Sequence, residues 1–171
     1  MSSITCQTCP PPRQSHLLSI RQSMNVDQKS KREEIESRIP HRPPMLLIDE
    51  IVEEMEDSIT CRKTFRPDEF FVQGHYPDFP IVPGVILTEC GAQTGAVLLS
   101  KKVTGTEGVP VLTKLESVRF KNMIRPGQTI EINVQLDDQV SSAFYLTARI
   151  SCEGKMAVRF SFVCSLVPAH Q

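Results

Sequence analysis

The sequence predicts an α+β fold in which one long central helix is wrapped by a curved antiparallel β-sheet. Two observations predict it. The segment 84–99 is long enough for a helix and apolar almost all round, which is typical of an enclosed helix. Beyond Lys102 the chain turns to segments in which apolar and polar residues alternate, as over 129–136. Period two indicates strands with one buried face, and these strands have to cover the helix.

The N-terminal 26 residues are rich in Ser, Gln and Pro and show no apolar periodicity. We expect them to form a disordered tail before a single domain over 27–171, and Met24 is a second candidate start of the protein. Asp27 is a candidate N-cap, followed by helix-forming residues. The pattern predicts a short surface helix from Asp27 to about Arg38.

The remaining elements follow from periodicity and turn residues. Two β-rich segments, 45–55 and 58–65, flank the acidic turn Glu56-Asp57 and predict a hairpin. Pro83 stands near the first turn of the helix over 84–99, where proline is favoured. The later strands are predicted over 109–120, 129–136, 143–152 and 156–167, with turns at Pro126-Gly127, Asp137-Asp138 and Glu153-Gly154. The simplest connection between these strands is an antiparallel meander.

Charge and composition exclude several classes of partner. Lys and Arg number 19 against 20 for Asp and Glu, so nothing in the balance favours nucleic acid or an anionic membrane. No secretory signal is visible, so we expect a cytoplasmic protein. The apolar stretch 79–100 has the length of a membrane span, but it contains Pro80, Pro83 and Glu89. We interpret it as a buried helix of a soluble core.

The six cysteines are too scattered to predict a disulfide framework or a zinc site. Cys6 and Cys9 form a CxxC pair, but no second pair accompanies it, and a structural zinc ion needs four ligands. We therefore expect no metal. Cys90 is interpreted as a small core residue rather than a nucleophile.

His75 lies in the most unusual segment of the chain, between Gly74 and a run in which three prolines fall within seven residues. The prolines restrict the backbone, and Gly74 would allow a close approach of the chain beside the imidazole. Because imidazole titrates near neutrality, this is a suitable place for a general base.

Glu89 is the second candidate, because it is the only ionisable Asp, Glu, Lys, Arg or His between Asp78 and Lys101. A carboxyl group is tolerated on a buried helix when it is hydrogen-bonded, or when it stays protonated and can act as an acid. An imidazole base and a carboxylic acid form the pair that a β-elimination needs. The third component is Gly84, whose backbone amide at the start of the helix could stabilise an enolate oxygen.

Structural interpretations of the same residues remain open. His75 alone is more often a loop residue than a catalyst, and Glu89 could anchor a loop through hydrogen bonds. Gln93, one turn beyond Glu89, could serve only to satisfy that carboxylate. Spacing alone does not show that His75 and Glu89 meet in one site.

The strongest match is to a known family. The string from Gly74 to Gln93, which includes His75-Tyr76-Pro77, Pro83-Gly84-Val85 and Glu89, resembles the β-hydroxyacyl-acyl-carrier-protein dehydratases of the FabZ type. Further signatures of that family match at Ile39-Pro40-His41-Arg42, at Leu46-Leu47-Ile48-Asp49, at Arg119-Phe120-Lys121 and at Pro126-Gly127-Gln128. The resemblance covers the chain from about Ile39 to the C-terminus.

The resemblance implies a hot-dog fold and dehydration of a (3R)-3-hydroxyacyl thioester to the trans-2-enoyl product in fatty-acid biosynthesis. It implies a homodimer, often a trimer of dimers, in which His75 and Glu89 from opposite subunits share one catalytic site. It implies no cofactor, and a substrate carried on the phosphopantetheine of an acidic acyl carrier protein. The substrate-binding residues that we expect are Gly84, Val85, Gln93, Phe71 and Tyr76. Basic residues that could contact the carrier are Lys101, Lys102, Arg119, Lys121 and Arg125.

A glutamate on the helix, rather than an aspartate, resembles the branch that dehydrates without isomerising the product. The chain departs from the family pattern at Pro43 and Met45, which replace aromatic residues, at Glu50, which replaces a basic residue, and at Tyr76. Chain-length preference and carrier identity are therefore not predicted. A hot-dog acyl thioesterase and a non-catalytic acyl-binding or carrier-binding module are the alternative functions.

Overall fold

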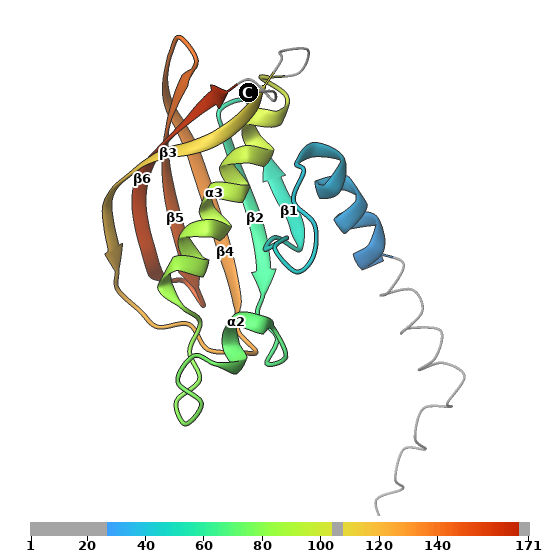
Figure 1. Ribbon diagram of the computed structural model, residues 1–171, viewed down its shortest axis with the longest axis vertical. Helices are drawn as coiled ribbons and strands as arrows, with labels where there is room; N and C mark the ends of the chain where they lie inside the picture. The colour runs from blue at the N-terminus through green and yellow to red at the C-terminus, as the bar shows by residue number, and fades with distance from the viewer. Residues whose placement is uncertain (1–26, 104–107, 168–171) are drawn as a thin grey trace, which may run out of the picture.

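The computed structural model describes residues 27–103 and 108–167 (Figure 1). The expectations for the N-terminal tail, Met24 and the Cys6-Cys9 pair fall outside these residues. A helix over 27–38 comes first, as predicted. The elements that follow are β1 (Glu50–Glu54), β2 (Ser58–Thr64), α2 (Phe70–Gln73), α3 (Gly84–Ser100), β3 (Val109–Phe120), β4 (Thr129–Val140), β5 (Ala143–Cys152) and β6 (Lys155–Val167).

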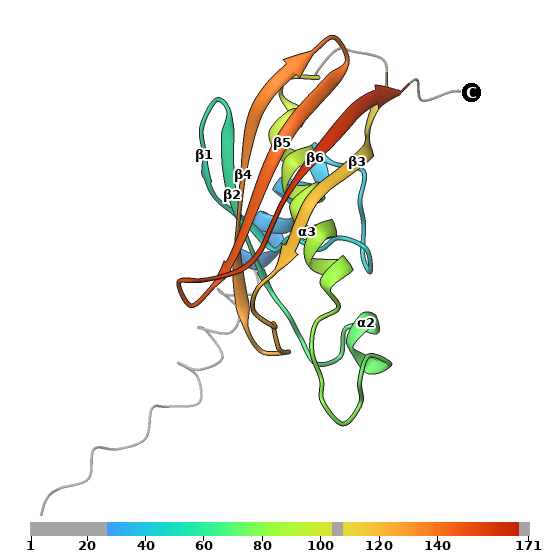
Figure 2. The same cartoon turned by 90° about the vertical axis from the view of Figure 1, so that its left-hand side faces the viewer.

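Within the described residues the strands form one six-stranded antiparallel sheet in the order β1-β2-β4-β5-β6-β3. The sheet curves around α3, which lies along its inner face (Figure 2). The predicted hairpin of β1 and β2 is confirmed, although β1 has only five residues. The α+β architecture with a wrapped central helix is confirmed.

Two predicted connections are wrong. A meander holds only for β4, β5 and β6, because β3 lies at the far edge and pairs with β6 rather than with β4. Asp137 and Asp138 do not form a turn but continue β4, because the register shift between Leu136 and Asp138 accommodates the extra residue. The turn falls at Ser141, which has a φ of 55°.

The helix α3 is enclosed over its C-terminal half and open at its start. Val97 and Leu99 are fully buried, whereas Val85 is 71% exposed, so the expectation of a fully buried helix is wrong for the first turns. A Cβ at Gly91 would lie 2.5 Å from Cζ of Phe160 on β6. The absence of a side chain therefore allows the helix to lie close against the sheet. Over the described residues, no helix is long and apolar enough to cross a membrane.

Candidate active site

The carboxylate of Glu89 lies on the partly exposed part of α3, where the side chain is 30% exposed. Gln93, one turn later, is 1% exposed and donates a hydrogen bond from Nε2 to Oε1 of Glu89 at 2.8 Å. The interpretation that Gln93 satisfies this carboxylate is confirmed by that bond.

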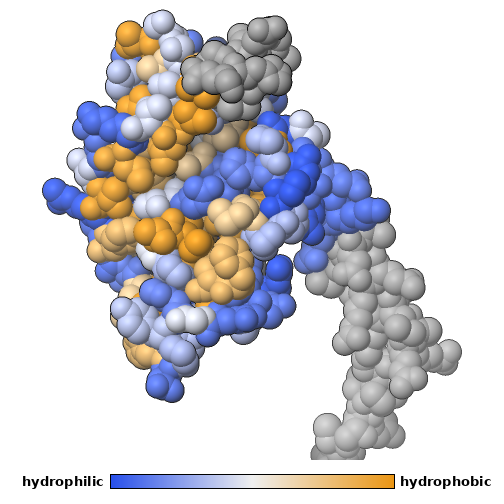
Figure 3. Space-filling model, in the orientation of Figure 1, coloured by the Kyte–Doolittle hydropathy of each residue, from blue (hydrophilic) through white to orange (hydrophobic). Residues whose placement is uncertain are grey.

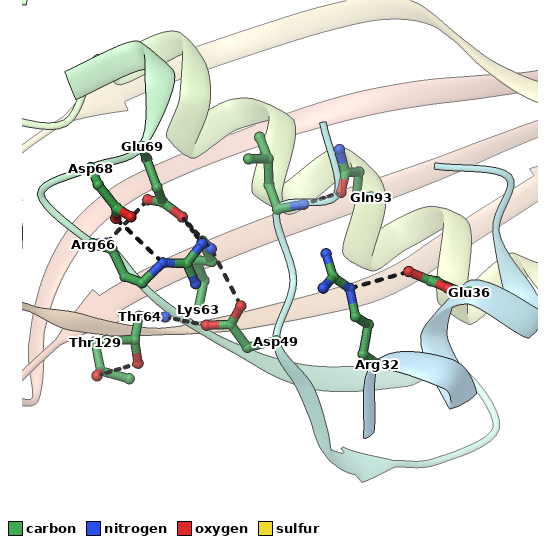
Figure 4. A network of polar contacts seen from close by, with 11 residues as sticks. Arg32, Glu36, Asp49, Lys63, Thr64, Arg66, Asp68, Glu69, Gln93 and Thr129 are labelled. Atoms are coloured by element: carbon green, nitrogen blue, oxygen red, sulfur yellow. Dashed lines mark hydrogen bonds and ion pairs between the residues drawn. The ribbon is translucent and has the colours of Figure 1, made fainter. Parts of the chain in front are cut away.

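Gln93 is itself held by the backbone of the segment that precedes β1. Its Nε2 also donates to the carbonyl of Met45 at 2.7 Å, and its Oε1 accepts from the amide of Leu47 at 2.9 Å. Figure 4 shows Gln93 projecting from α3 toward this segment. Both N–H bonds of the amide are engaged, so Gln93 connects Glu89 to a fixed stretch of backbone.

His41 is a neighbour of Glu89 that sequence reasoning missed. Its Nε2 lies 3.8 Å from Oε1 of Glu89. Among the described residues, His41 Nδ1 is the one buried side-chain nitrogen or oxygen without a hydrogen-bond partner. The ring is therefore oriented with Nε2 toward the carboxylate, whereas Nδ1 has no partner. In the sequence, His41 stands out only as part of a family signature, and no helix or strand period connects it to Glu89.

The first residues of α3 provide backbone donors. The amides of Ile86 and Leu87 both donate to the carbonyl of Pro83, which leaves the amides of Gly84 and Val85 ahead of the first helical hydrogen bonds. A Cβ at Gly84 would lie 2.7 Å from the Phe120 ring, so the ring lies directly against the helix start. These amides are polarised by the helix dipole and suit a developing negative charge.

His75 lies in the loop that follows α2, a short helix that the sequence did not predict. Its amide donates to the carbonyl of Val72 at 3.1 Å, and its ring lies 4.5 Å from the ring of Tyr76. Tyr76 has a φ of 50° and is 61% exposed. Phe71, on α2 itself, packs edge-on against Phe65 at 6.0 Å.

The predicted close approach at Gly74 is wrong within the described chain. A Cβ at that position would meet nothing within 4 Å, and the residue has a φ of −107°, which other residues also adopt.

A buried lysine anchors α2. Lys63 of β2 is 3% exposed, and its Nζ lies 2.6 Å from Oε1 of Glu69, the N-cap of α2, and 3.3 Å from Oδ1 of Asp49. Figure 4 shows the ammonium group between the two carboxylates, with Asp49 also accepting the amide of Thr64. The loop that carries His75 is therefore tied to the sheet through an ion pair that is 3% and 8% exposed.

The structure gathers the predicted residues into two groups. Glu89, Gln93, Gly84 and Val85 lie on α3, and Phe71, Tyr76 and His75 lie on α2 or its following loop. Within the described chain no hydrogen bond or ion pair joins His75 to Glu89. One chain therefore presents an oriented carboxyl group and free helix amides on one element, and an imidazole on another.

Cys90, next to Glu89, has no exposed surface. Burial raises the pKa of its thiol far above the ordinary range, and it raises the pKa of the Cys61 thiol to about 12. A thiol that stays protonated is a poor nucleophile, which supports the interpretation of Cys90 as a core residue. The described residues contain no group of three or more His, Cys, Asp or Glu side chains that could hold a metal ion.

The family model described as ApeI-like, ApeI dehydratase, matches residues 51–159. The enzyme 3-hydroxyacyl-[acyl-carrier-protein] dehydratase FabZ of Clostridium perfringens strain SM101 is 36% identical over 124 residues, which cover 72% of this chain and 89% of that protein. FabZ of Pseudothermotoga lettingae is 37% identical over 133 residues, covering 78% and 89% respectively.

Solved structures match the fold at lower identity. The ApeI:P dehydratase heterocomplex of Xenorhabdus doucetiae aligns with a TM-score of 0.69 and 20% identity, covering 79% of this chain and 91% of that one. The PaaI protein of the E. coli phenylacetic acid degradation operon aligns with a TM-score of 0.59 and 12% identity, over 84% and 98% respectively. These matches confirm the hot-dog fold.

Proposed function

Because the chain belongs to the ApeI-like dehydratase family and is an enzyme of the FabZ type, we propose that it dehydrates 3-hydroxyacyl thioesters with His75 as base and Glu89 as acid. The substrate is a (3R)-3-hydroxyacyl group on an acyl carrier protein, and the product is the trans-2-enoyl thioester of fatty-acid biosynthesis.

The elimination requires a general base, a donor that stabilises the enolate oxygen, and a general acid. The imidazole of His75 removes a proton from the carbon next to the thioester carbonyl. The enolate oxygen that develops is stabilised by the amide of Gly84 and the dipole of α3. The carboxyl group of Glu89 donates a proton to the departing hydroxyl, which leaves as water. Phe71, Val85 and Tyr76 supply apolar surface for the acyl chain.

The observation that carries this proposal is the placement of Gly84 and Glu89 on one helix, with Glu89 oriented by Gln93. Five residues of helix separate the amide from the carboxyl group by about 7.5 Å along the axis. A carbonyl held at the helix start therefore has its β-carbon within reach of the acid. His41 Nε2 lies 3.8 Å from the same carboxyl oxygen that accepts the bond from Gln93.

A homodimer would complete the site by bringing His75 of one subunit to Glu89 of the other. The edge strand β3 supports this assembly, because its outer edge is unpaired within the described residues and Leu112 and Leu115 are 43% and 44% exposed. Apolar side chains gather over β3 and α3 on the face shown in Figure 3. A second copy paired along β3 would cover them and continue the sheet.

Mixing two inactive variants tests both the residues and the assembly. We expect His75→Ala and Glu89→Gln each to abolish hydration of a crotonyl thioester while the circular dichroism spectrum stays unchanged. After co-refolding at equal amounts, about a quarter of wild-type activity should return, because half of the dimers are mixed and each mixed dimer has one intact site. No recovery would contradict a site shared between subunits.

The same assay separates the alternative functions. A thioesterase would release free thiol from the acyl thioester, whereas a dehydratase leaves the thioester bond intact and releases none. A binding module would bind the carrier and show neither thiol release nor hydration. Retained hydration activity in the His75→Ala variant would remove His75 from the mechanism.

A further inference from the structure

Three arginines form a row across neighbouring strands on the outer face of the sheet. Arg119 of β3 is the register partner of Arg159 of β6, and Arg159 is the register partner of Arg149 of β5. Register partners point to the same face of a sheet. All three side chains are exposed, whereas Ala148 and Phe160, the neighbours of Arg149 and Arg159 in the chain, are buried against the core. The row therefore lies on the face that points away from α3.

The positive charge of this row is not compensated by the protein. Over 27–103 and 108–167, the side chains of Arg119, Arg149, Arg159 and the nearby Lys121 have no ion pair or hydrogen bond. Like charges at directly opposed cross-strand positions are destabilising. The row therefore destabilises the folded protein, and the stability of the fold gives no reason for its presence.

The adjacent row on the same face shows the opposite arrangement. Arg62 of β2 lies 2.7 Å from the carboxylate of Glu131 on β4 and 3.5 Å from that of Glu50 on β1. Charges on this part of the sheet are paired across strands, so the arginine row is a local exception. We call Arg119, Arg149 and Arg159 the arginine row.

The arginine row borders a recess. Arg119, Arg159 and Lys121 line a cavity of about 380 Å³, together with the hydroxyl-bearing residues Ser117 and Ser161 and with Phe160. A concave surface that combines several cations with hydroxyl donors favours anionic groups.

The row also lies close to the proposed catalytic centre. Phe120 stands between Arg119 and Lys121 in the chain, and its ring lies against Gly84 at the start of α3. The end of β3 therefore contacts the helix start with one side chain and presents cations on either side of it. The Arg119 end of the row is therefore next to the place where a thioester carbonyl is expected.

The other basic residues expected to meet the carrier are already engaged. Lys101 pairs with Glu54 at 2.7 Å, Lys102 pairs with Asp57 at 2.8 Å, and the Arg125 guanidinium stacks over a phenylalanine ring at 4.3 Å. Of that set only Arg119 and Lys121 are free among the described residues, and both border the recess.

We propose that the arginine row and Lys121 form the docking surface for the acidic face of the carrier protein that delivers the thioester. This inference rests on the proposed function and names the surface through which the carrier is recognised. Two strand spacings give the row a length of about 10 Å. That length exceeds one phosphate group and matches about two turns of a helix with carboxylates on one side. An extended acidic protein surface is therefore the occupant that fits.

Neutralising one cation at a time tests the docking surface. The variants are Arg119→Gln, Arg149→Gln and Arg159→Gln, and Arg62→Gln is the matched control because it removes an arginine from the same face that is already paired. Each is assayed with 3-hydroxyacyl thioesters of the carrier protein, of coenzyme A and of N-acetylcysteamine. Binding of the carrier is measured separately by calorimetry at two salt concentrations.

Each row variant should raise KM for the carrier-linked substrate about tenfold, weaken carrier binding equally and reduce its salt dependence. The coenzyme A and N-acetylcysteamine substrates should be turned over as by the wild type, and Arg62→Gln should change nothing. Three outcomes would overturn the inference: no effect on carrier binding, an equal loss with all three substrates, or an equal loss with carrier and coenzyme A. The last would indicate recognition of a phosphate group instead.

Failure of the proposed function would look different. A wild-type protein that binds the carrier through the row but dehydrates none of the three substrates would refute the dehydratase assignment and leave the docking surface intact.

Discussion

Nε2 of Gln93 lies 2.8 Å from Oε1 of Glu89, and the same amide nitrogen lies 2.7 Å from the carbonyl oxygen of Met45. The proposed catalytic acid is thus connected to the backbone ahead of β1 through one buried side chain. A carboxyl group held in this way loses rotational freedom before substrate binds, which is an advantage when a proton must reach one particular oxygen.

Replacing Gln93 by Met should separate activity from stability. The variant loses the bond to Glu89, so we expect kcat to fall about tenfold or more while KM changes little. It also leaves the buried Leu47 amide unsatisfied, at about 1 to 3 kcal/mol, and removes the bond to the Met45 carbonyl. Steady-state kinetics below the unfolding midpoint and urea titration measure the two effects. Thr94→Val is the control, because its buried hydroxyl bonds to the carbonyl of Cys90 and to the Cys61 thiol and not to Glu89.

His41 should act on Glu89 together with Gln93. We expect His41→Leu to lower kcat, because the carboxyl group loses the imidazole 3.8 Å away and gains rotational freedom. A double-mutant cycle with Gln93→Met should show a coupling of about 0.5 kcal/mol or more in the activation free energy. Strictly additive effects would mean that His41 does not orient the acid.

Removing the buried ammonium of Lys63 should be strongly destabilising. Lys63→Met leaves the buried Glu69 with only the exposed Arg66 guanidinium, 3.8 Å away, and losing one partner of a buried pair costs about 3 to 5 kcal/mol. The double variant with Glu69→Leu should recover much of this loss, because it removes both charges. Lys101→Met is the control, because that side chain is 68% exposed and its pair contributes about 1 kcal/mol or less. Chemical denaturation of the wild type, Lys63→Met, the double variant and Lys101→Met measures the free energy of unfolding of each. An equal loss in Lys63→Met and Lys101→Met would contradict the prediction.

The contact between Gly91 and the ring of Phe160 should not tolerate a methyl group. Gly91→Ala places a Cβ 2.5 Å from Cζ of that ring, and overpacking of this kind costs about 1 to 3 kcal/mol. Phe160→Leu makes room, so the double variant should be less destabilised than the sum of the two single variants. Thermal unfolding of the wild type, the two single variants and the double variant measures these effects. Additive losses of stability would show that α3 can shift away from the Phe160 ring to accommodate the methyl group.

Acid should weaken the attachment of the first described helix to β1. The Arg38 guanidinium, assisted by Lys101, holds the pKa of Glu54 at about 2, below its ordinary value of 4.5. A lowered pKa in the folded state stabilises the protein at and above pH 4.5, and this stabilisation is lost as the pH falls from 4.5 toward 2. Denaturation midpoints across this interval should decline more steeply in the wild type than in Glu54→Gln. Parallel curves would contradict the role of this ion pair.

Much of the fold could be predicted because it depends on periodicity and on turn residues. The alternation over β4 and β5 and the continuous apolar run of α3 predicted their types and most of their bounds. The position of β3 could not be predicted, because its pairing with β6 depends on where α3 directs the chain and not on any local pattern. Asp137 and Asp138 looked like a turn because a register shift within a strand leaves no distinct composition.

The site was predicted unevenly for a similar reason. Gln93 and Glu89 are one helical turn apart, so their contact follows from spacing. His41 reaches Glu89 through the folding of a distant segment, and Lys63 reaches Glu69 through the turn between β2 and α2; neither contact follows a helix or strand period. The arginine row was missed because Arg119, Arg149 and Arg159 come together only through strand register.

The ion pair of Lys63 with Glu69 and the packing of α3 give the two proposed catalytic groups unequal mechanical support. Glu89 belongs to α3, which packs against the core, whereas His75 lies in a loop that follows α2, and α2 is attached to the sheet through the ion pair of Glu69 with Lys63. On warming, the loop that carries His75 should therefore become disordered before the sheet and α3 unfold. Enzyme activity would then be lost at a temperature below the midpoint of global unfolding.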